Sequence, residues 1–414
     1  MHTTGVICEL NPFHGGHAYL LSRMREEAGD EGLVVCLMSG RFVQRGEPAA
    51  ADPYLRAGMA LSGGADLVLE LPFPWSAASA EHFAGAGVRI LARLGVESLA
   101  FGSECGDHTL LSHVAGALDT PAFRDTYAAL CREGTGTAVA YAKALREAVS
   151  IPLPDGFPSS NDLLGITYLQ ALRRLVQEGI TPPRAEPVTR RGTAYRDAAF
   201  VPDAYPSATA LRRRMEELRG SLPLSEVIPR EAMPAASRAL LLEALAGEEA
   251  PLSGERLMAF YHGLYRLPIP PSHREPAEWN GGMAGHIHRA ACASATPEAF
   301  WEELRTKQYT DARLRRALLF GAVGVTPKDL REVPRYTTLL AANRRGCAYL
   351  KEWQKANRDA SDGFTVVTKP ADAPHLRQRE LGEAADALFT LCFPHPKEAG
   401  AMLKRTPVIQ ESSP

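Results

Sequence analysis

Several features that would narrow the class of protein are scarce in this sequence. No apolar run is long enough to span a membrane as a helix, and no amino-terminal stretch has the pattern of a signal peptide. The chain has 46 basic and 48 acidic residues, and its net charge of −2 excludes a uniformly basic nucleic-acid binder but not a local basic face. These absences favour a cytoplasmic protein without membrane contact, and the length of 414 residues favours two domains.

Cysteine is also scarce. The seven cysteines are odd in number and scattered, and none belongs to a Cys-x-x-Cys pair, so the sequence suggests neither a zinc site nor a disulfide framework. Cys8 and Cys36 fall inside predicted strands, where a reduced thiol acts as a small apolar residue. No cluster of metal-ligand residues is visible, so we predict no metal centre built by the protein itself.

The first hundred residues alternate between strand-like and helix-like segments. Short apolar runs separated by helical stretches indicate βαβ units and a parallel sheet, so we predict an α/β, Rossmann-like domain over residues 1–220. The predicted strands are Gly5–Leu10, Leu33–Met38, Asp66–Leu71, Ser98–Phe101 and Pro187–Arg191. The predicted helices between the first four strands are 17–28, 52–63 and 77–94.

Helical patterns dominate the rest of the chain. Residues 109–149 are rich in alanine and predict helix, whereas 266–285 are rich in proline and glycine and predict a loop. Beyond residue 220, strand signals are few, and the predicted helices are 236–247, 254–265, 297–305 and 311–322. We therefore predict a mostly α-helical domain over 221–406 and a frayed tail over 407–414.

The first predicted strand leads into the most informative motif, Asn11-Pro-Phe-His-Gly-Gly-His17. An amphipathic run follows, so the motif occupies a tight turn at the start of a helix, where free N–H groups attract an anion. Gly15 and Gly16 let a phosphate approach the backbone closely. His14 and His17, one helical turn apart, are able to hydrogen-bond the oxygens of a reacting phosphate. Because a lone H-x-G-H string also arises by chance, the motif needs support from elsewhere.

That support comes from the places where predicted strands end. Clusters of polar residues and glycines fall there: Asn11–His17, Ser39–Glu47 and Gly102–Glu104. Because ligands of a parallel sheet bind beyond the carboxyl ends of its strands, we expect these clusters to meet at one edge. The second cluster carries Arg41, Gln44 and Arg45, and arginine forks suit phosphate and carboxylate. The alternatives are a solvated polar loop for this cluster and an ordinary turn at Gly102.

Further polar residues at strand and helix ends extend the candidate site. Glu70 lies inside an apolar strand, so it either faces polar partners near the strand end or pairs with a cation in the site. Asn161 either caps a helix or hydrogen-bonds an adenine or a ribose. Arg190 and Arg191 are either surface charges or ligands of a polyphosphate.

Two helical segments carry basic residues. The first joins hydroxyls, an expected helix N-terminus and a guanidinium, which suit phosphates: Ser207, Thr209 and Arg212. In the helical half, Arg313 and Arg316 share one helix face near Lys307. A charged run is usually a solvated face, and contact with an RNA backbone is the alternative.

Together these segments resemble the bacterial tRNA(Met) cytidine acetate ligases, a family of HxGH nucleotidyltransferases. The resemblance is dense through about residue 215 and looser afterwards. It rests on Gly5–His17, Met38–Pro48, Asp66–Phe73, Phe101–Glu104 and Ser207–Arg212, with Lys307–Arg313 as a further match. Two departures are Pro53-Tyr54, where we expect a Lys-Trp pair, and Gly281–Ile287, where we expect an acidic and arginine-containing pattern.

The resemblance implies a nucleotidyltransferase fold and a ligase that uses ATP, with Mg²⁺ as a companion of the nucleotide. Such an enzyme converts acetate to acetyl-adenylate, releases pyrophosphate, and acetylates N4 of the wobble cytidine of elongator tRNA(Met). His14 and His17 are then the catalytic residues, and the helical half is the part that contacts tRNA. The expected ATP-binding residues are Val6, Ile7, Cys8, Glu9, Leu10, Asn11, Pro12, Phe13, Gly15, Gly16, Ala18, Tyr19, Leu20, Gly102, Asn161, Arg190, Arg191, Ser207, Thr209 and Arg212. The candidates for contact with acetate or tRNA are Arg41, Gln44, Arg45, Glu70, Lys307, Arg313 and Arg316.

Two other functions stay open. A cofactor adenylyltransferase of the same superfamily would act on a small phosphorylated substrate, but such enzymes are small, and a long helical half suits a macromolecular substrate better. A non-catalytic nucleotide- or RNA-binding homologue would need neither histidine. The sequence predicts no oligomeric state.

Overall fold

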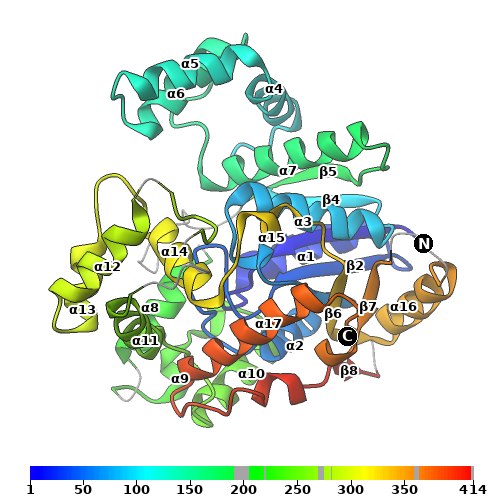
Figure 1. Ribbon diagram of the computed structural model, residues 1–414. Helices are drawn as coiled ribbons and strands as arrows, with labels where there is room; N and C mark the ends of the chain where they lie inside the picture. Colours follow the sequence, from blue (N-terminus) through cyan, green and yellow to red (C-terminus); the bar gives the residue numbers. More distant parts are fainter. Residues whose placement is uncertain (191–204, 219–220, 269–274, 281, 359–362, 412–414) are drawn as a thin grey trace.

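The computed structural model describes residues 1–190, 205–218, 221–268, 275–280, 282–358 and 363–411. A mostly parallel sheet crosses the molecule with helices on both faces, and further helices gather beyond one end of it (Figure 1). This arrangement confirms the predicted α/β class with a helical region after it. Within the described residues, no helix has the length and apolarity that a membrane crossing needs.

The strands of the first half form the centre of the sheet. They are β1 (Thr3–Cys8), β2 (Leu33–Ser39), β3 (Leu67–Leu71), β4 (Ser98–Ser103) and β5 (Arg184–Thr189). Their order is β5-β4-β1-β2-β3, and neighbours are parallel, so each predicted strand has a counterpart. β1 and β5 begin and end earlier along the chain than predicted, and Arg191 of the predicted fifth strand lies outside the described residues. Every residue of β2 is buried, because alternate side chains pack into the cores on the two faces of the sheet.

The second half also contributes strands, which the sequence did not predict. β6 (Tyr336–Asn343) is antiparallel to β3, and β7 (Thr365–Val367) and β8 (Val408–Gln410) run parallel to opposite ends of β6. β8 lies where the sequence predicted a frayed tail, and that prediction is wrong for these three residues because they pair with residues 341–343. Residues on both sides of the proposed boundary at 220 therefore contribute strands to the same sheet.

Helices cover both faces of the sheet. On one face lie α1 (Gly15–Ala28), α2 (Pro53–Ser62), α8 (Ala208–Leu218) and α10 (Ala235–Ala246). On the other lie α3 (Ala80–Arg93), α7 (Ser160–Gln177) and α16 (Arg344–Ala356). The helix predicted over 77–94 begins later, at Ala80, because a 3-10 turn over Trp75–Ala77 precedes it.

Residues 109–149, predicted as helical, form a group of helices that projects beyond α7 (Figure 1). They are α4 (His108–Leu118), α5 (Pro121–Arg132) and α6 (Thr137–Ala148). The first break falls at Thr120, whose side chain caps α5, and Pro121 lacks the N–H that would continue α4. The second follows Glu133, where Gly134 adopts a φ of 84°.

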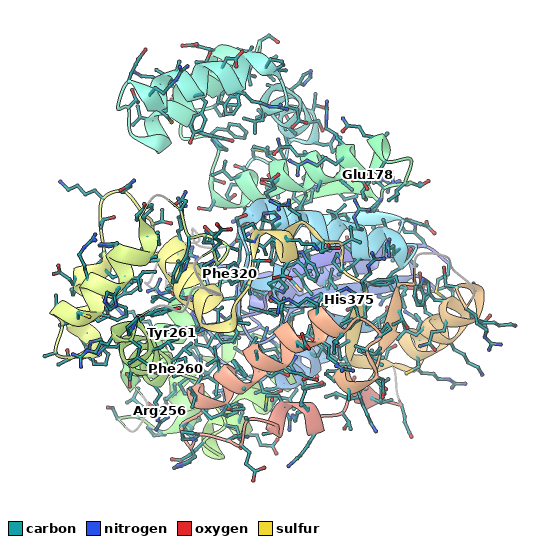
Figure 2. The ribbon with its side chains drawn as sticks, viewed as in Figure 1. Glu178, Arg256, Phe260, Tyr261, Phe320 and His375 are labelled. Carbon is teal, nitrogen blue, oxygen red and sulfur yellow. The ribbon has the colours of Figure 1, made fainter. Side chains whose placement is uncertain are left out.

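Most of the remaining helices build a further core, to which Phe42 and Phe73 of the first half also belong. They are α11 (Glu255–Arg266), α12 (Met283–Ala293), α13 (Pro297–Leu304), α14 (Asp311–Val323), α15 (Pro327–Arg331) and α17 (Leu376–Phe389). Tyr261 and Phe320 lie inside this core, whereas Phe260 is partly exposed on the outer side of α11 (Figure 2). The short helix α9 (Leu224–Val227) packs instead, through Val227, into the core that α2, α8 and α10 share. α12 begins within the last residues of the loop predicted over 266–285.

Candidate active site

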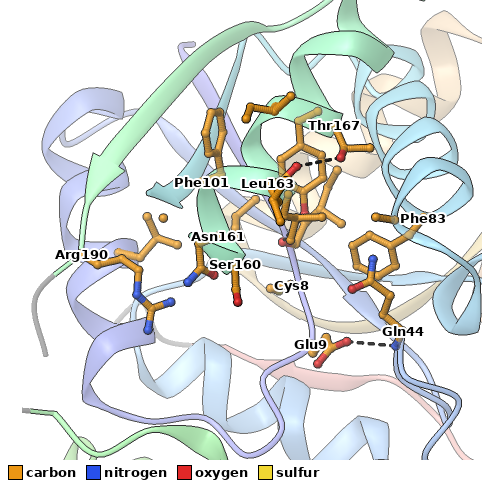
Figure 3. Close-up of a pocket in the computed structure, with 18 of the residues that line it drawn as sticks. Cys8, Glu9, Gln44, Phe83, Phe101, Ser160, Asn161, Leu163, Thr167 and Arg190 are labelled. Atoms are coloured by element: carbon orange, nitrogen blue, oxygen red, sulfur yellow. Dashed lines mark hydrogen bonds between the residues drawn. The ribbon is translucent and has the colours of Figure 1, made fainter. Parts of the chain in front are cut away.

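A pocket of about 760 Å³ opens beyond the carboxyl ends of β1, β4 and β5 (Figure 3). The Asn11–His17 turn, the 39–47 loop and the end of β4 all contribute to this main pocket, which confirms that the predicted clusters meet at one edge. The predicted site residues that line it are Val6, Ile7, Cys8, Glu9, Leu10, Asn11, His14, Gly16, His17, Tyr19, Leu20, Gln44, Arg45, Gly102, Asn161, Arg190, Ser207 and Arg212.

The two histidines form a reciprocal cap at the start of α1. His14 Nδ1 accepts a hydrogen bond from the Gly16 N–H at 3.0 Å, and His17 Nδ1 accepts one from the His14 N–H at 3.2 Å. Since both Nδ1 atoms accept, the neutral rings carry their protons on Nε2. The ring centroids are 3.8 Å apart, so both Nε2–H donors belong to one small part of the pocket.

Both imidazoles are neutral at physiological pH. Burial, together with a smaller effect of the Arg190 charge, lowers the pKa of His17 to about 3. Burial also holds the pKa of His14 well below its usual range, with His17, Arg190 and Arg212 adding to the effect. The site therefore presents neutral hydrogen-bond donors from the histidines and fixed positive charge from the arginines.

The arginines come from separate elements. Arg212 of α8 donates from Nη1 to the carbonyl oxygen of Asn11 at 2.6 Å, which ties the helix to the phosphate-binding turn. Arg190 follows β5 and packs over Gly102, where a Cβ, if the residue had one, would lie 3.2 Å from Arg190 Cγ. A guanidinium and the edge of a glycine thus form one wall of the pocket.

Asn161 and Arg190 share a carboxylate that the sequence did not single out as a partner. Asn161 Nδ2 donates to Glu104 Oε1 at 2.5 Å, and Arg190 Nε lies 3.9 Å from the same oxygen. Asp162 is buried and accepts from the Ser103 hydroxyl at 2.6 Å and the Glu104 N–H at 3.0 Å, which joins the end of β4 to the start of α7. The signal for Asp162 was its place three residues after the cap Ser159.

Sequence reasoning also missed Arg56, which supports the site from below. Its guanidinium is fully buried and donates from Nη1 to the carbonyl oxygens of Glu9 at 2.6 Å and Ser39 at 3.1 Å. It therefore fixes the ends of β1 and β2 relative to each other.

The apolar part of the pocket wall was also missed by the sequence analysis. It includes Phe83, Leu118, Phe123, Tyr141, Leu163, Leu164 and Tyr168.

Some predicted site residues do not line the main pocket. Among the residues that the structure describes, they are Pro12, Phe13, Gly15, Ala18 and Thr209. Gly15 faces the ring of Tyr205, which would lie 2.3 Å from a Cβ, so its missing side chain serves packing with Tyr205. Thr209 Oγ1 accepts from Arg212 Nη2 at 3.2 Å and so orients that arginine. Arg191 lies outside the described residues.

Arg41 and Glu70 also lie away from the main pocket. Arg41 Nη1 is 2.7 Å from Glu70 Oε1, and Arg41 Nε is 2.8 Å from Asp386 Oδ1 of α17. All three side chains are buried. One of the two alternatives was that Glu70 pairs with a cation in the site. Glu70 does pair with a cation, Arg41, but the pair belongs to an ion cluster behind the 39–47 loop and not to the main pocket.

The basic residues of the helical half lie outside the main pocket as well. Arg313 and Arg316 both pair with Glu278, at 3.4 and 2.8 Å. Lys307 is exposed. Arg316 Nη1 also reaches the carbonyl oxygen of Gln44 at 3.5 Å, so this helix touches the rear of the pocket-lining loop.

Comparison with known proteins agrees with this geometry. The family described as HIGH Nucleotidyl Transferase matches residues 1–401. The H-x-G-H turn at the edge of a parallel sheet and this match define a nucleotidyl transferase of the HIGH class.

The relatives narrow the class further. The tRNA(Met) cytidine acetate ligase of Acetivibrio thermocellus is 33% identical over 99% of this chain and 100% of its own length, and that of Caldicellulosiruptor saccharolyticus is 34% identical over 92% of each. Thermotoga maritima TmcAL has crystal structures in an apo form and with α-thio ATP bound, which match with TM-scores of 0.85 and 0.84 at 26% identity over 100% of both chains. The chain belongs to the tRNA(Met) cytidine acetate ligase family.

Proposed function

We propose that this protein is an ATP-dependent tRNA(Met) cytidine acetate ligase. It activates acetate as acetyl-adenylate and then acetylates N4 of the wobble cytidine of elongator tRNA(Met). The observation that carries the proposal is the Asn11–His17 turn, where two neutral imidazoles meet two guanidiniums at an open pocket. Relatives of that name match the chain over almost its whole length, which supports the substrate assignment.

In the first step a carboxylate oxygen of acetate attacks the α-phosphorus in line with the departing pyrophosphate. Such transfers depend mainly on positioning and on stabilising charge. We assign the Nε2–H donors of His14 and His17 to the phosphate oxygens, and Arg190 and Arg212 to the charge that develops there. The other proposed ATP contacts are the pocket-lining residues of the 6–20 segment, Gly102, Asn161 and Ser207.

Mg²⁺ is proposed as a companion of ATP. Among the described residues, no three His, Cys, Asp or Glu side chains gather as a metal site. Mg²⁺ commonly keeps several waters and binds through substrate phosphates with one or two carboxylates. The nucleotide and water would therefore supply most of the ligands of this ion.

In the second step the acetyl group passes to the tRNA. We propose that residues 221–406 contact the tRNA while residues 1–220 hold ATP. Lys307 is exposed on this half, and Arg313 and Arg316, which both pair with Glu278, follow it on α14. Basic side chains of this kind suit a phosphate backbone.

The variant His17→Ala tests the proposed chemistry. We expect acetate-dependent acetylation, measured by mass analysis of the tRNA, to fall at least ~100-fold, the usual loss when one preorganised donor is removed from developing charge. His113→Ala is the matched control, because His113 on α4 is exposed and its ring contacts the carbonyl oxygen of Thr109. Full activity of a folded His17→Ala protein would overturn the assignment.

The wild-type protein separates the alternative functions. Pyrophosphate release that requires acetate supports the ligase. Release that requires a phosphorylated small molecule instead supports a cofactor adenylyltransferase, and no turnover with either supports a binding protein.

A further inference from the structure

The main pocket has a second end, away from Arg190 and Asn161. Glu9, Gln44 and Phe83 form this end, and Figure 3 shows them opposite Arg190 across the pocket. Glu9 follows β1, Gln44 belongs to the 39–47 loop, and Phe83 comes from α3. Gln44 and Phe83 are not among the proposed ATP contacts, and of that set only Glu9 is reassigned here to the other substrate, so this end is available to it.

The polar groups at this end are held in fixed positions. The backbone N–H of Gln44 donates to Glu9 Oε1 at 3.0 Å (Figure 3). Arg56 Nη1 donates to the carbonyl oxygen of Glu9 at 2.6 Å, and Arg316 Nη1 reaches that of Gln44 at 3.5 Å. The Glu9 carboxylate and the backbone of Gln44 are thus held in place before any ligand arrives.

The side chain of Gln44 points to a ligand. Its Nε2 atom is buried and finds no hydrogen-bond partner among the described residues. Buried polar atoms are nearly always hydrogen-bonded, and one without a partner in a pocket wall calls for an acceptor from outside. The missing partner of Nε2 must carry an acceptor atom, and a ligand that also reaches the Glu9 carboxylate needs a donor beside that acceptor.

Cytosine has this pattern on its Watson–Crick edge. Its N4 amine donates, and its N3 and O2 atoms accept, whereas uracil presents an acceptor at O4 and a donor at N3. Acetate fits this end poorly, since it is an anion and would face the carboxylate of Glu9. Enzymes that modify a base also take it out of the stack and hold it against apolar or aromatic side chains, as Phe83 allows.

We propose that this end of the main pocket receives the cytosine ring, with Glu9 accepting a hydrogen bond from N4 and Gln44 Nε2 donating to N3 or O2. This inference rests on the proposed function. It makes Glu9 and Gln44 the residues that distinguish cytosine from uracil.

The same contact gives Glu9 a part in the transfer step. N4 attacks the acetyl carbonyl carbon, the C–N bond forms, and the bond from that carbon to the phosphate oxygen breaks, so that AMP leaves with the electron pair. The proton lost from N4 passes to the Glu9 carboxylate. Burial raises the pKa of Glu9, although the Gln44 N–H, Arg212 and Arg45 act in the opposite direction, and a raised pKa makes the carboxylate a better proton acceptor.

The test compares Glu9→Gln and Gln44→Leu with the wild type. One readout is the ratio of affinities for tRNA with cytosine or uracil at the wobble position, which we expect to fall about tenfold or more in each variant, as for loss of a base-reading hydrogen-bond pair. A second readout compares tRNA acetylation with acetate-dependent pyrophosphate exchange. We expect Glu9→Gln to lower acetylation more than exchange, because exchange needs no cytosine.

A matched control and a stability measurement make the outcome decisive. Glu47→Gln removes a carboxylate from the same loop, where it pairs with Arg315 at 3.0 Å, and should leave the cytosine-to-uracil ratio unchanged. Gln44→Leu removes a buried amide without a partner, so it should raise Tm while weakening cytosine preference, which a purely structural role would not do. If Glu9→Gln does not fold, Gln44→Leu alone decides.

The two proposals fail in different ways. If the wild type acetylates tRNA but both variants keep the wild-type preference and rate, the cytosine assignment is wrong and the ligase function stands. If the wild type neither exchanges pyrophosphate in the presence of acetate nor acetylates tRNA, the proposed function itself is wrong.

Discussion

The ion cluster behind the 39–47 loop should make stability depend on pH through one residue. Arg41 lies between Glu70 and Asp386, and all three are at least 93% buried, since their exposed fractions are 5, 7 and 5%. One guanidinium cannot neutralise two buried carboxylates fully. Burial raises the pKa of Asp386 to about 7, with Glu70, Asp52 and Glu383 adding to the rise and Arg41 opposing it. The perturbation that tests this balance is Asp386→Asn.

The sign follows from the two states of the chain. Unfolded, Asp386 releases its proton near the ordinary value of 3.8, whereas the folded state keeps it up to about 7. Between these values the folded state holds more protons, so the free energy of unfolding falls as pH rises and levels off above the folded pKa. Each pH unit in that window is worth about 1.4 kcal/mol. Between pH 5 and 8, where about two units of the window remain, the wild type should lose about 3 kcal/mol relative to Asp386→Asn.

Urea unfolding of both proteins at pH 5, 6, 7 and 8 measures this difference. Arg41→Met is the contrasting variant, because it leaves two buried carboxylates without their cation and should cost about 3–5 kcal/mol at pH 8. A difference between wild type and Asp386→Asn that stays constant within about 0.5 kcal/mol over this range would show that Asp386 is ionised throughout, and would refute the reasoning.

The remaining predictions concern the main pocket. Arg56→Lys keeps the charge but loses the fork that holds two strand ends, so Tm should drop by several degrees, measured by calorimetry; an unchanged Tm would show that the fork is dispensable. Gly102→Val places a branched side chain against Arg190, whose Cγ is 3.2 Å from the position that a Cβ would take, and should raise KM for ATP about tenfold. The KM of Gly102→Ala should lie between those of the wild type and Gly102→Val. Because folded His17 has a pKa of about 3, acetate-dependent pyrophosphate release should not show a histidine titration between pH 6 and 8. In the unfolded chain His17 takes up a proton below its ordinary pKa of 6.5, whereas the folded protein does not until about 3. The free energy of unfolding should therefore decrease as pH falls below 6.5, and this decrease should be smaller in His17→Ala.

The central strands were predictable because both faces of the sheet are covered. Leu33–Met38 is a continuous apolar run between two helical patterns, and such a run has few structures open to it other than a buried strand. β6 is equally buried, but its partner β3 precedes it by more than half the chain, and its Thr, Leu and Ala residues suit helix as well as strand. Long-range pairing, which leaves no local pattern, decided its structure.

The candidate site was predictable for those residues whose position is set by the ends of strands. The Asn11–His17 turn and Gly102 lie at strand ends, so the rule for parallel sheets placed them together. Arg41 and Arg45 look alike in the sequence, four residues apart in one loop. Arg41 pairs with Asp386 of α17, whereas Arg45 lines the main pocket. The sequence of the loop itself does not indicate which arginine does which.

The helical half positions part of the site, since it holds the 39–47 loop from the rear. Asp386 of α17 pairs with Arg41, and the α14 backbone lies so close to Gly46 that a Cβ there would be 2.7 Å from the Arg316 nitrogen. Gln44 extends from the same loop into the main pocket, so its place depends on helices far along the chain. A chain that ended at residue 220 would keep the phosphate-binding turn but lose these contacts and the β6 edge of the sheet. The described residues that line the main pocket all come from the first half, and the second half contributes by holding the loop that carries Gln44.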